Sequence, residues 1–306
     1  MPIKQYIAYR NAVDAENQQR IASHQASVAA VAPGANPLNL IADGDSWFDY
    51  PLGGAIPLVD HTDVIAQLRT ALKPGSLLLS LAHAGDATTT ILGATKRQVF
   101  AAALADPAHG TFDAILFSAG GDDLVGEQFR FWLRDAAKAD NDPAHAIDAV
   151  ALAGVLTVIK AGYLDLVALR NKTLGPNAPI FVHAYDFALP DGRGACTLGP
   201  WLLPSLADRG WMAADAPPSA ADLARAAGIV RDMLTQFHHM MADLEADPAN
   251  NIVYVRTQGI LAADAGFQND WANELHPTPP GFARVAARFV EALEARFPGQ
   301  AQPATA

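Results

Sequence analysis

The stretch that decides the fold reads NLIADGDSWFDYP and covers residues 39–51. Its first half belongs to an apolar run near residues 38–43, which is typical of a buried strand in a parallel sheet. Its second half places Ser46 directly after that strand and before a turn. Ligands of open α/β sheets bind outside the carboxyl ends of the strands. Ser46 is therefore expected where a nucleophile would be useful.

Four more short apolar runs follow, and longer stretches with helical spacing separate them. The stretch at residues 147–169 is one such helix candidate, because its apolar residues can share much of one face. Strands that alternate with helices predict an α/β fold, a three-layer αβα sandwich around a parallel five-stranded sheet. The four additional strands are expected at residues 76–82, 113–119, 179–185 and 251–256.

The chain of 306 residues is expected to form one domain over residues 1–298. A helix is expected within residues 1–35, and residues 299–306 are expected to form a flexible tail. An insertion at residues 187–218 is rich in Pro and Gly, and it carries Trp201 and Trp211. It is too long for an ordinary connection, so it is either an active-site lid or a surface packing arm.

Composition limits the class of protein. Hydrophobic residues make up 51% and charged residues 17%, which excludes intrinsic disorder. The 21 Lys and Arg against 32 Asp and Glu give a net charge of −11, so nucleic acid is a poor partner. The single cysteine, Cys196, excludes an internal disulfide and a Cys-rich metal site, and it is expected to be a small buried apolar residue.

The first residues lack the apolar core of a signal peptide. No segment has the uninterrupted run of about 18 apolar residues that a membrane span needs. We therefore expect a cytoplasmic protein without integral membrane contact, and the sequence leaves the oligomeric state open.

Polar residues also follow the other expected strands. Gly85 and Asp86 come after the second strand, Gly120-Gly121-Asp122-Asp123 after the third, and Asn273-Glu274-Leu275-His276 beyond the fifth. The carboxyl ends of parallel strands lie at one edge of a sheet, so these loops should converge on Ser46. Asp86 is expected to cap the helix that begins with TTTIL. The serine lacks the second glycine of a GxSxG elbow, which disfavours an ordinary α/β-hydrolase.

These four blocks resemble, in order, those of the SGNH or GDSL-like hydrolases, a family of esterases and acyl hydrolases. The first block is matched by Gly44-Asp45-Ser46-Trp47, and the resemblance runs from about residue 38 to about residue 290. It implies a flavodoxin-like fold with Ser46 as nucleophile and His276 as general base. It also implies an oxyanion hole formed by Ser46, Gly85 and position 122. No cofactor is expected.

Two residue types are exchanged relative to this family, which has Asn at position 122 and Asp at position 273. Asn273 can still orient His276 through its side-chain oxygen, but it supplies no charge. An ionised Asp122 presents only acceptors to an oxyanion. Three arrangements of Asp122 therefore stay open: it is protonated, it turns away, or it pairs with His276.

The expected function is a serine hydrolase that cleaves carboxylic esters through an acyl-Ser46 intermediate. Its pocket is expected to include Asp45, Trp47, His83 and Trp201, and aromatic walls favour an acyl or aryl ester as the small-molecule partner. For His83, a structural hydrogen bond is the favoured alternative. A catalytically impaired binding module, a glycan deacetylase and an acyltransferase are the other functions considered.

A calcium site is the other interpretation of Asp43, Asp45 and Asp49. The glycine and glutamate of an EF-hand loop are missing at the required offsets. Bonding within the strand end and the turn is therefore preferred, and no metal is predicted.

Overall fold

The computed structural model describes residues 3–50, 63–195, 198–213, 218–264 and 266–301. Five parallel strands form one sheet in the order β2-β1-β3-β4-β5. All five expected strands are confirmed, as is the α/β class. The strands are β1 (Asn39–Gly44), β2 (Leu77–Ser80), β3 (Ala114–Ser118), β4 (Ile180–His183) and β5 (Ile252–Val255).

The strand order reverses at β1, which lies between β2 and β3. This is the flavodoxin-like order, and its switch point is where such sheets bind ligands. All six residues of β1 are buried, as an apolar central strand should be. Gly44 pairs with Ser118 of β3, and a Cβ atom on Gly44 would lie 2.7 Å from the Ser118 carbonyl oxygen. Glycine is therefore required at the end of β1, two residues before Ser46.

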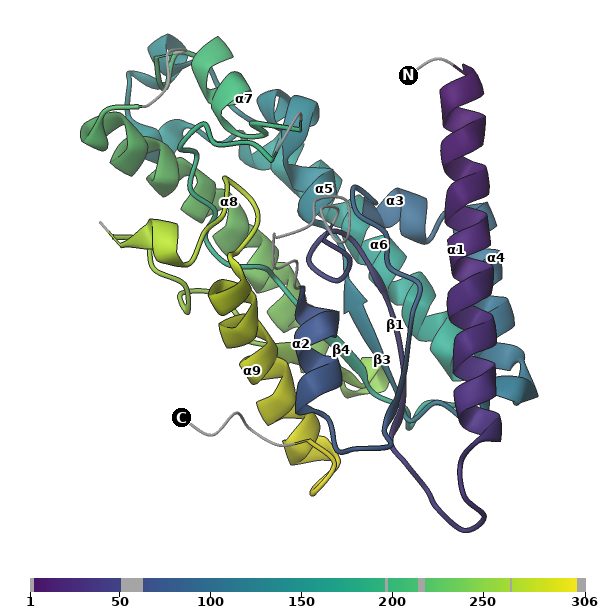
Figure 1. The fold of residues 1–306 in the computed structure, drawn as a ribbon. Helices are drawn as coiled ribbons and strands as arrows, with labels where there is room; N and C mark the ends of the chain where they lie inside the picture. The colour runs from purple at the N-terminus through teal and green to yellow at the C-terminus, as the bar shows by residue number, and fades with distance from the viewer. Residues whose placement is uncertain (1–2, 51–62, 196–197, 214–217, 265, 302–306) are drawn as a thin grey trace.

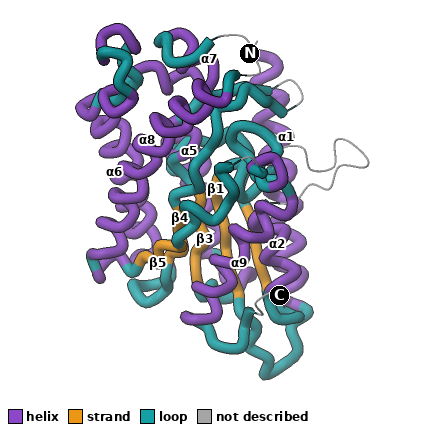
Figure 2. Tube along the Cα trace, turned by 90° about the vertical axis from the view of Figure 1, so that its left-hand side faces the viewer, coloured by secondary structure: helices purple, strands orange, loops and turns teal. Residues whose placement is uncertain are grey.

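Helices cover both faces of the sheet, and Figures 1 and 2 show the three layers. On one face α2 (Val64–Ala71) packs against α9 (Pro279–Arg296). On the other face α6 (Ala149–Thr173) packs against both α4 (Ala94–Ala105) and α8 (Ala220–Ala246). The expected αβα sandwich is confirmed.

Short helices fill several connections, and one of them corrects an expectation. Thr88, the first residue of α3, donates its backbone N–H to the carboxylate of Asp123 at 2.7 Å. Asp86 instead pairs with Lys96, so the expectation that Asp86 caps this helix was wrong. The short helices are α3 (Thr88–Ile91), α5 (Gly121–Leu124), α7 (Leu203–Asp208), η1 (Pro107–His109), η2 (Gly126–Phe131), η3 (Ala136–Ala139), η4 (Pro143–His145), η5 (Pro248–Asn250) and η6 (Phe267–Asn269).

Helix α1 (Ile3–Ala29) runs along the edge strand β2 and also contacts η1 (Figure 1). Two hydrogen bonds of buried His24 hold it there. The His24 Nδ1 atom lies 2.8 Å from Nδ1 of His109, and its Nε2 atom lies 3.0 Å from Oδ1 of Asn39. The amino-terminal helix is therefore part of the packed fold at the sheet edge.

Helix α6 is, among the residues described, the one helix long and apolar enough to cross a membrane by length and composition. Lys160 and Asp165 interrupt its apolar run. Its inner face is buried through residues such as Ile159 and Leu166, whereas Val150 on its outer face is exposed.

The segment at residues 187–218 contains α7, which packs against η2. Trp211 is buried, and its indole N–H donates to the Arg134 carbonyl at 2.7 Å. Residues 196–197 and 214–217 of this segment, Cys196 among them, lie outside the described residues. A lid role for the segment stays a prediction. At the carboxyl end, the Ala301 N–H donates to Glu294 at 3.0 Å, and residues 302–306 lie outside the described part.

Candidate active site

Ser46 and His276, which are 230 residues apart in sequence, meet at the carboxyl edge of the sheet. The Oγ atom of Ser46 lies 2.8 Å from Nε2 of His276, and both residues are buried. Ser46 lies in the turn after β1, where the Asp45 N–H donates to the Ser118 carbonyl at 3.1 Å. His276 lies two residues before Thr278, the N-cap of α9. The Trp47 indole donates to the Leu275 carbonyl at 3.0 Å and joins the two loops.

Asn273 fixes the tautomer of His276. Its Oδ1 atom accepts the N–H groups of Leu275 and His276 at 3.0 and 2.9 Å, which settles which end of the amide is oxygen. The same oxygen lies 2.9 Å from Nδ1 of His276, so Nδ1 carries the proton. Nε2 is then free to accept the hydroxyl proton of Ser46. The Asn273 amide nitrogen donates to the Tyr50 hydroxyl at 3.3 Å.

Among the described residues, no carboxylate is bonded to the imidazole ring of His276. Burial lowers the pKa of His276 to about 3, so the ring is neutral at ordinary pH. Within the described part of the chain, no hydrogen bond or ion pair joins Asp122 to His276. The structure therefore gives the Nδ1 position to the amide of Asn273, as the sequence suggested.

Asp45 accepts three hydrogen bonds behind Ser46. Its Oδ1 atom accepts the Ser118 hydroxyl at 2.8 Å and the Trp47 N–H at 3.0 Å, and its Oδ2 atom accepts the Tyr185 hydroxyl. The Ser118 proton points to Asp45 because His183 Nε2, 2.8 Å from Ser118 Oγ, carries a proton of its own. That proton lies on Nε2 because Nδ1 of His183 accepts the Tyr185 N–H at 3.2 Å.

Tyr185 connects this network to the third block. Its hydroxyl accepts the Gly121 N–H at 3.0 Å while it donates to Asp45. A Cβ atom on Gly121 would lie 2.8 Å from the Tyr185 ring, and Gly120 has a φ of +107°. The two glycines thus allow the turn after β3 to lie against Tyr185.

Asp122 lines the pocket beside Ser46 and is half-buried. Its carboxyl group has no hydrogen-bond partner among the residues that the structure describes. Burial raises the pKa of Asp122, and the charges of Asp123 and Asp86 raise it further. Burial and the charge of Asp122 likewise raise the pKa of Asp45, against the effect of its hydrogen-bond donors. Asp45 and Asp122 therefore disfavour each other's charge.

The pocket next to Ser46 is small and has mainly apolar walls. Its volume is about 40 Å³, room for a few non-hydrogen atoms. Of the residues expected in the pocket, Asp45 and Trp47 line it, whereas Trp201 is not among its lining residues. The other lining residues are Ser46, Gly121, Asp122, Val125, Tyr185, Asp186, Ala188, Leu234 and Leu275.

Trp201 lies edge-on to the ring of His276, with a centroid distance of 5.3 Å and an interplanar angle of 75°. Buried Glu274 holds the segment that carries it. The Glu274 carboxylate accepts four backbone N–H groups at 2.6 to 3.1 Å. These belong to Gly192, Trp201, Leu202 and Leu203. The insertion is therefore attached directly to the loop that carries His276.

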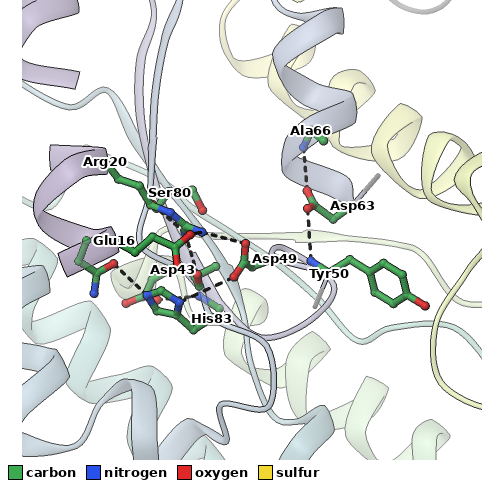
Figure 3. A network of polar contacts seen from close by, with 12 residues as sticks. Glu16, Arg20, Asp43, Asp49, Tyr50, Asp63, Ala66, Ser80 and His83 are labelled. Carbon is green, nitrogen blue, oxygen red and sulfur yellow. Dashed lines mark hydrogen bonds and ion pairs between the residues drawn. The ribbon is translucent and has the colours of Figure 1, made fainter. Parts of the chain in front are cut away.

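His83 lies outside the lining of this pocket. Its Nε2 atom is 2.9 Å from Oδ1 of Asn17 on α1, and its Nδ1 atom is 3.7 Å from Asp49. Burial lowers the pKa of His83 to about 3, with the charges of Lys96 and Arg20 adding to the effect. His83 thus belongs to a polar network between α1 and the loops after β1 and β2 (Figure 3).

Arg20 is the cation of that network. It donates to Asp49 at 3.0 Å and to the Ala82 carbonyl at 2.9 Å (Figure 3). The three aspartates near Ser46, which are Asp43, Asp45 and Asp49, therefore each have different hydrogen-bond donors. Asp43 accepts the N–H of Gly44, Asp45 accepts the three donors named above, and Asp49 accepts Arg20.

Gly85 has a φ of +80° in the loop after β2 and is not among the residues that line the pocket. In the described part of the chain, the N–H groups of Gly85 and Ser46 have no acceptor. They stay available as donors.

Ser118, Tyr185 and Glu274 are among the residues of the site that were not named as site residues from the sequence. Ser118 and Tyr185 lie at the carboxyl ends of expected strands, and Glu274 lies inside the last block. Their position at strand ends was the available signal, because their bonding partners are distant in sequence.

No protein-family profile matches the chain, and no curated protein matches it significantly. Among solved structures, it is similar to a lipase/acylhydrolase from Enterococcus faecalis, at 14% identity and a TM-score of 0.42 over 88% of this chain and 100% of that one. It is also similar to AlinE4, an SGNH-hydrolase family esterase, at 16% identity and a TM-score of 0.37 over 87% of this chain and 99% of that one. The solved structures similar to this chain thus include a member of the family that its four sequence blocks resemble.

Proposed function

We propose that the protein is a serine hydrolase that cleaves carboxylic esters through an acyl-Ser46 intermediate. The observation that carries this proposal is the chain of two hydrogen bonds, 2.8 and 2.9 Å long, from Ser46 through His276 to Asn273. A nucleophile bonded to a base, with the base oriented by a third group, is the arrangement that activates a serine hydroxyl.

In the first half of the reaction, Ser46 Oγ attacks the ester carbonyl carbon while Nε2 of His276 takes the hydroxyl proton. The carbonyl π electrons move to its oxygen, which the N–H groups of Ser46 and Gly85 would receive. The tetrahedral intermediate then collapses, the bond to the leaving alkoxide breaks, and His276 returns the proton to that alkoxide. The products of this half are an alcohol and acyl-Ser46.

In the second half, His276 takes a proton from water as the water oxygen attacks the acyl carbon. Collapse of this second intermediate breaks the bond to Ser46 Oγ, and His276 returns the proton to Ser46. The carboxylic acid leaves. Asn273 holds the Nδ1–H tautomer throughout, so Nε2 is the atom that cycles the proton.

The dimensions of the pocket favour a short acyl group. A volume of about 40 Å³ beside Ser46 favours an acetyl or propionyl chain over a long one. Val125, Ala188 and Leu234 supply the apolar wall against which such a chain would pack.

A panel of esters with two to eight or so acyl carbons, with Ser46→Ala as control, tests this proposal. We expect hydrolysis that falls with chain length and is lost in the variant. Acetate release from acetylated sugars, with little activity on simple esters, would instead indicate a deacetylase. Folded protein without activity on any ester would indicate a binding module.

A further inference from the structure

The two exchanged residues of the site, Asn273 and Asp122, both change how the site depends on pH. Asn273 leaves His276 without an anionic partner, and Asp122 brings an ionisable group to the pocket beside Ser46. An amide at position 122 could donate a hydrogen bond at any pH. A carboxyl group can donate only when it carries its proton. The protonation state of Asp122 therefore decides whether it helps or opposes an oxyanion.

We propose that Asp122 acts as a neutral carboxylic acid that donates a hydrogen bond to the oxyanion, so that this hydrolase loses activity as the pH rises. The inference rests on the proposed ester hydrolysis and adds a catalytic role for Asp122. An ionised carboxylate beside the oxyanion would repel it by several kcal/mol at about 3 Å, more than one ordinary donor contributes.

Hydrogen-bond donors distinguish Asp45 from Asp122. Three donors point at Asp45, from Ser118, Trp47 and Tyr185. Each of these bonds favours the ionised form of Asp45. No donor within the described residues points at Asp122. Hydrogen bonds therefore do not stabilise the ionised form of Asp122 in the described part of the chain, and burial raises its pKa to about 6, so its carboxyl group holds a proton in acid.

The surroundings of Asp122 contain more acids than bases. The charges of Asp123 on its own helix and of Asp86 in the loop before α3 both act on it. Lys96, the nearby cation, is bound to Asp86. No basic side chain in the described part of the chain pairs with Asp122.

In the described part of the chain, α3, α6 and η2 pack against α5, and none of their basic side chains pairs with Asp122. Helix α3 carries no ionisable residue. On η2, Glu127 is exposed and Arg130 pairs with Asp208 at 3.0 Å. On α6, Tyr163 donates to the Ala119 carbonyl at 2.8 Å. The charged residues of α6 are Lys160, Asp165, Arg170 and Lys172, of which Asp165 bonds to Arg97 and Arg170 bonds to the Ala178 and Asn250 carbonyls.

The low pKa of His276 suits activity in acid. His276 must be neutral to accept the proton of Ser46, and burial without an anionic partner keeps its pKa low, at about 3. Both exchanges thus act in the same direction. Asn273 keeps the base neutral in acid, and Asp122 keeps its donor proton there.

The pH dependence of kcat/KM, measured from about pH 4 to about pH 10, tests the proposal. The substrate is ethyl acetate, and NMR detects the acetate released. We expect the wild-type value to fall as the pH rises through the range in which Asp122 ionises. Asp122→Asn should keep its activity across that range, because an amide donates at any pH, and should exceed wild type by about 10²–10³ fold at the alkaline end.

Asp123→Asn is the matched control, because Asn can still accept the Thr88 N–H. It should keep the fall and move it to lower pH, because the loss of a neighbouring charge lowers the pKa of Asp122. Asp122→Ala, with folding checked by circular dichroism, should remove the pH dependence and leave low activity throughout. Wild-type activity that rises with pH, or a fall that Asp122→Asn keeps, would overturn the inference.

The inference and the proposed function fail in different ways. Activity that depends on Ser46 but rises with pH overturns the role of Asp122 alone. Absence of Ser46-dependent hydrolysis at every pH, in both wild type and Asp122→Asn, overturns both.

Discussion

The Nδ1 atom of His276 lies 2.9 Å from the Oδ1 atom of Asn273, and the same oxygen accepts the backbone N–H of His276. One amide oxygen thus orients the base and fixes its tautomer without adding charge. Ser46, His276 and Asn273 thus have the hydrogen-bond geometry of the proposed triad, and the amide gives a protonated ring no charge stabilisation.

Asn273→Asp should supply that missing charge. A carboxylate at 273 favours the imidazolium form, so it raises the pKa of His276 from about 3. We expect the turnover of a short ester near neutral pH to rise about tenfold or more, because the protonated base forms in the transition state. A pH–rate profile should also show a new loss of activity in acid. An unchanged rate with an unchanged acid limb would contradict the role assigned to Asn273.

Leu234→Val should widen the acyl pocket by about one methylene group. Burial of one more methylene is worth about 0.8 kcal/mol, so kcat/KM for an ester one carbon longer should rise about fourfold relative to acetate. Leu244→Val is the matched control, because Leu244 is buried in the same helix and does not line the pocket. An equal rise in kcat/KM for the longer ester in Leu234→Val and Leu244→Val would show that residues outside this pocket set the chain-length preference.

Glu274→Gln should loosen the loop that carries Trp201. The variant loses the charge that four backbone N–H groups now share, and the amide nitrogen faces donors. We expect a loss of about 1–3 kcal/mol in the free energy of unfolding, measured with urea, and a lower kcat/KM. Glu127→Gln, at an exposed position, should change neither. Unaltered stability in Glu274→Gln would contradict the attachment of this segment to the His276 loop.

Arg20→Met should destabilise the protein more at neutral pH than in acid. Arg20 is the cation beside half-buried Asp49, whose pKa burial raises to about 6. Without Arg20 that pKa rises further. A carboxyl group whose pKa is higher in the folded protein than in the unfolded chain destabilises the folded protein as the pH rises above the pKa of the unfolded chain. We expect a deficit of about 1–3 kcal/mol at neutral pH and a smaller one near pH 4.

Urea unfolding at both pH values measures this difference. Glu16→Gln is the control, because Glu16 on α1 is exposed and contacts Arg20 at 2.6 Å without holding Asp49. A deficit in Arg20→Met that is equal at both pH values would contradict the ionic part of this contact.

The sheet could be predicted from the sequence because parallel strands buried on both faces read as continuous apolar runs. The four polar blocks were predictable because they follow strand ends, which topology brings to one edge. Ser46, His276 and Asn273 come together as that reasoning expected. The exchange of residue types at 122 and 273 was also visible in the sequence.

The contacts between distant segments could not be predicted. Asp123 rather than Asp86 binds the first N–H of α3, because the turn after β3 brings Asp123 to a helix 35 residues earlier. His83 bonds to α1, whose place along the β2 edge has no signal in local periodicity. Tyr185 bonds to both Asp45 and Gly121 because the ends of three strands meet there. The spacing of these residues in the sequence does not predict that contact.

The central claim is that Ser46 is a nucleophile activated by His276. Labelling of the folded protein with a fluorophosphonate, followed by mass spectrometry of its peptides, tests this most directly. We predict one label per chain on Ser46 and no label in Ser46→Ala, with labelling of His276→Ala slower by about 10²–10⁴ fold. A folded wild-type protein that stays unlabelled, or that carries its label on another serine, would contradict the account.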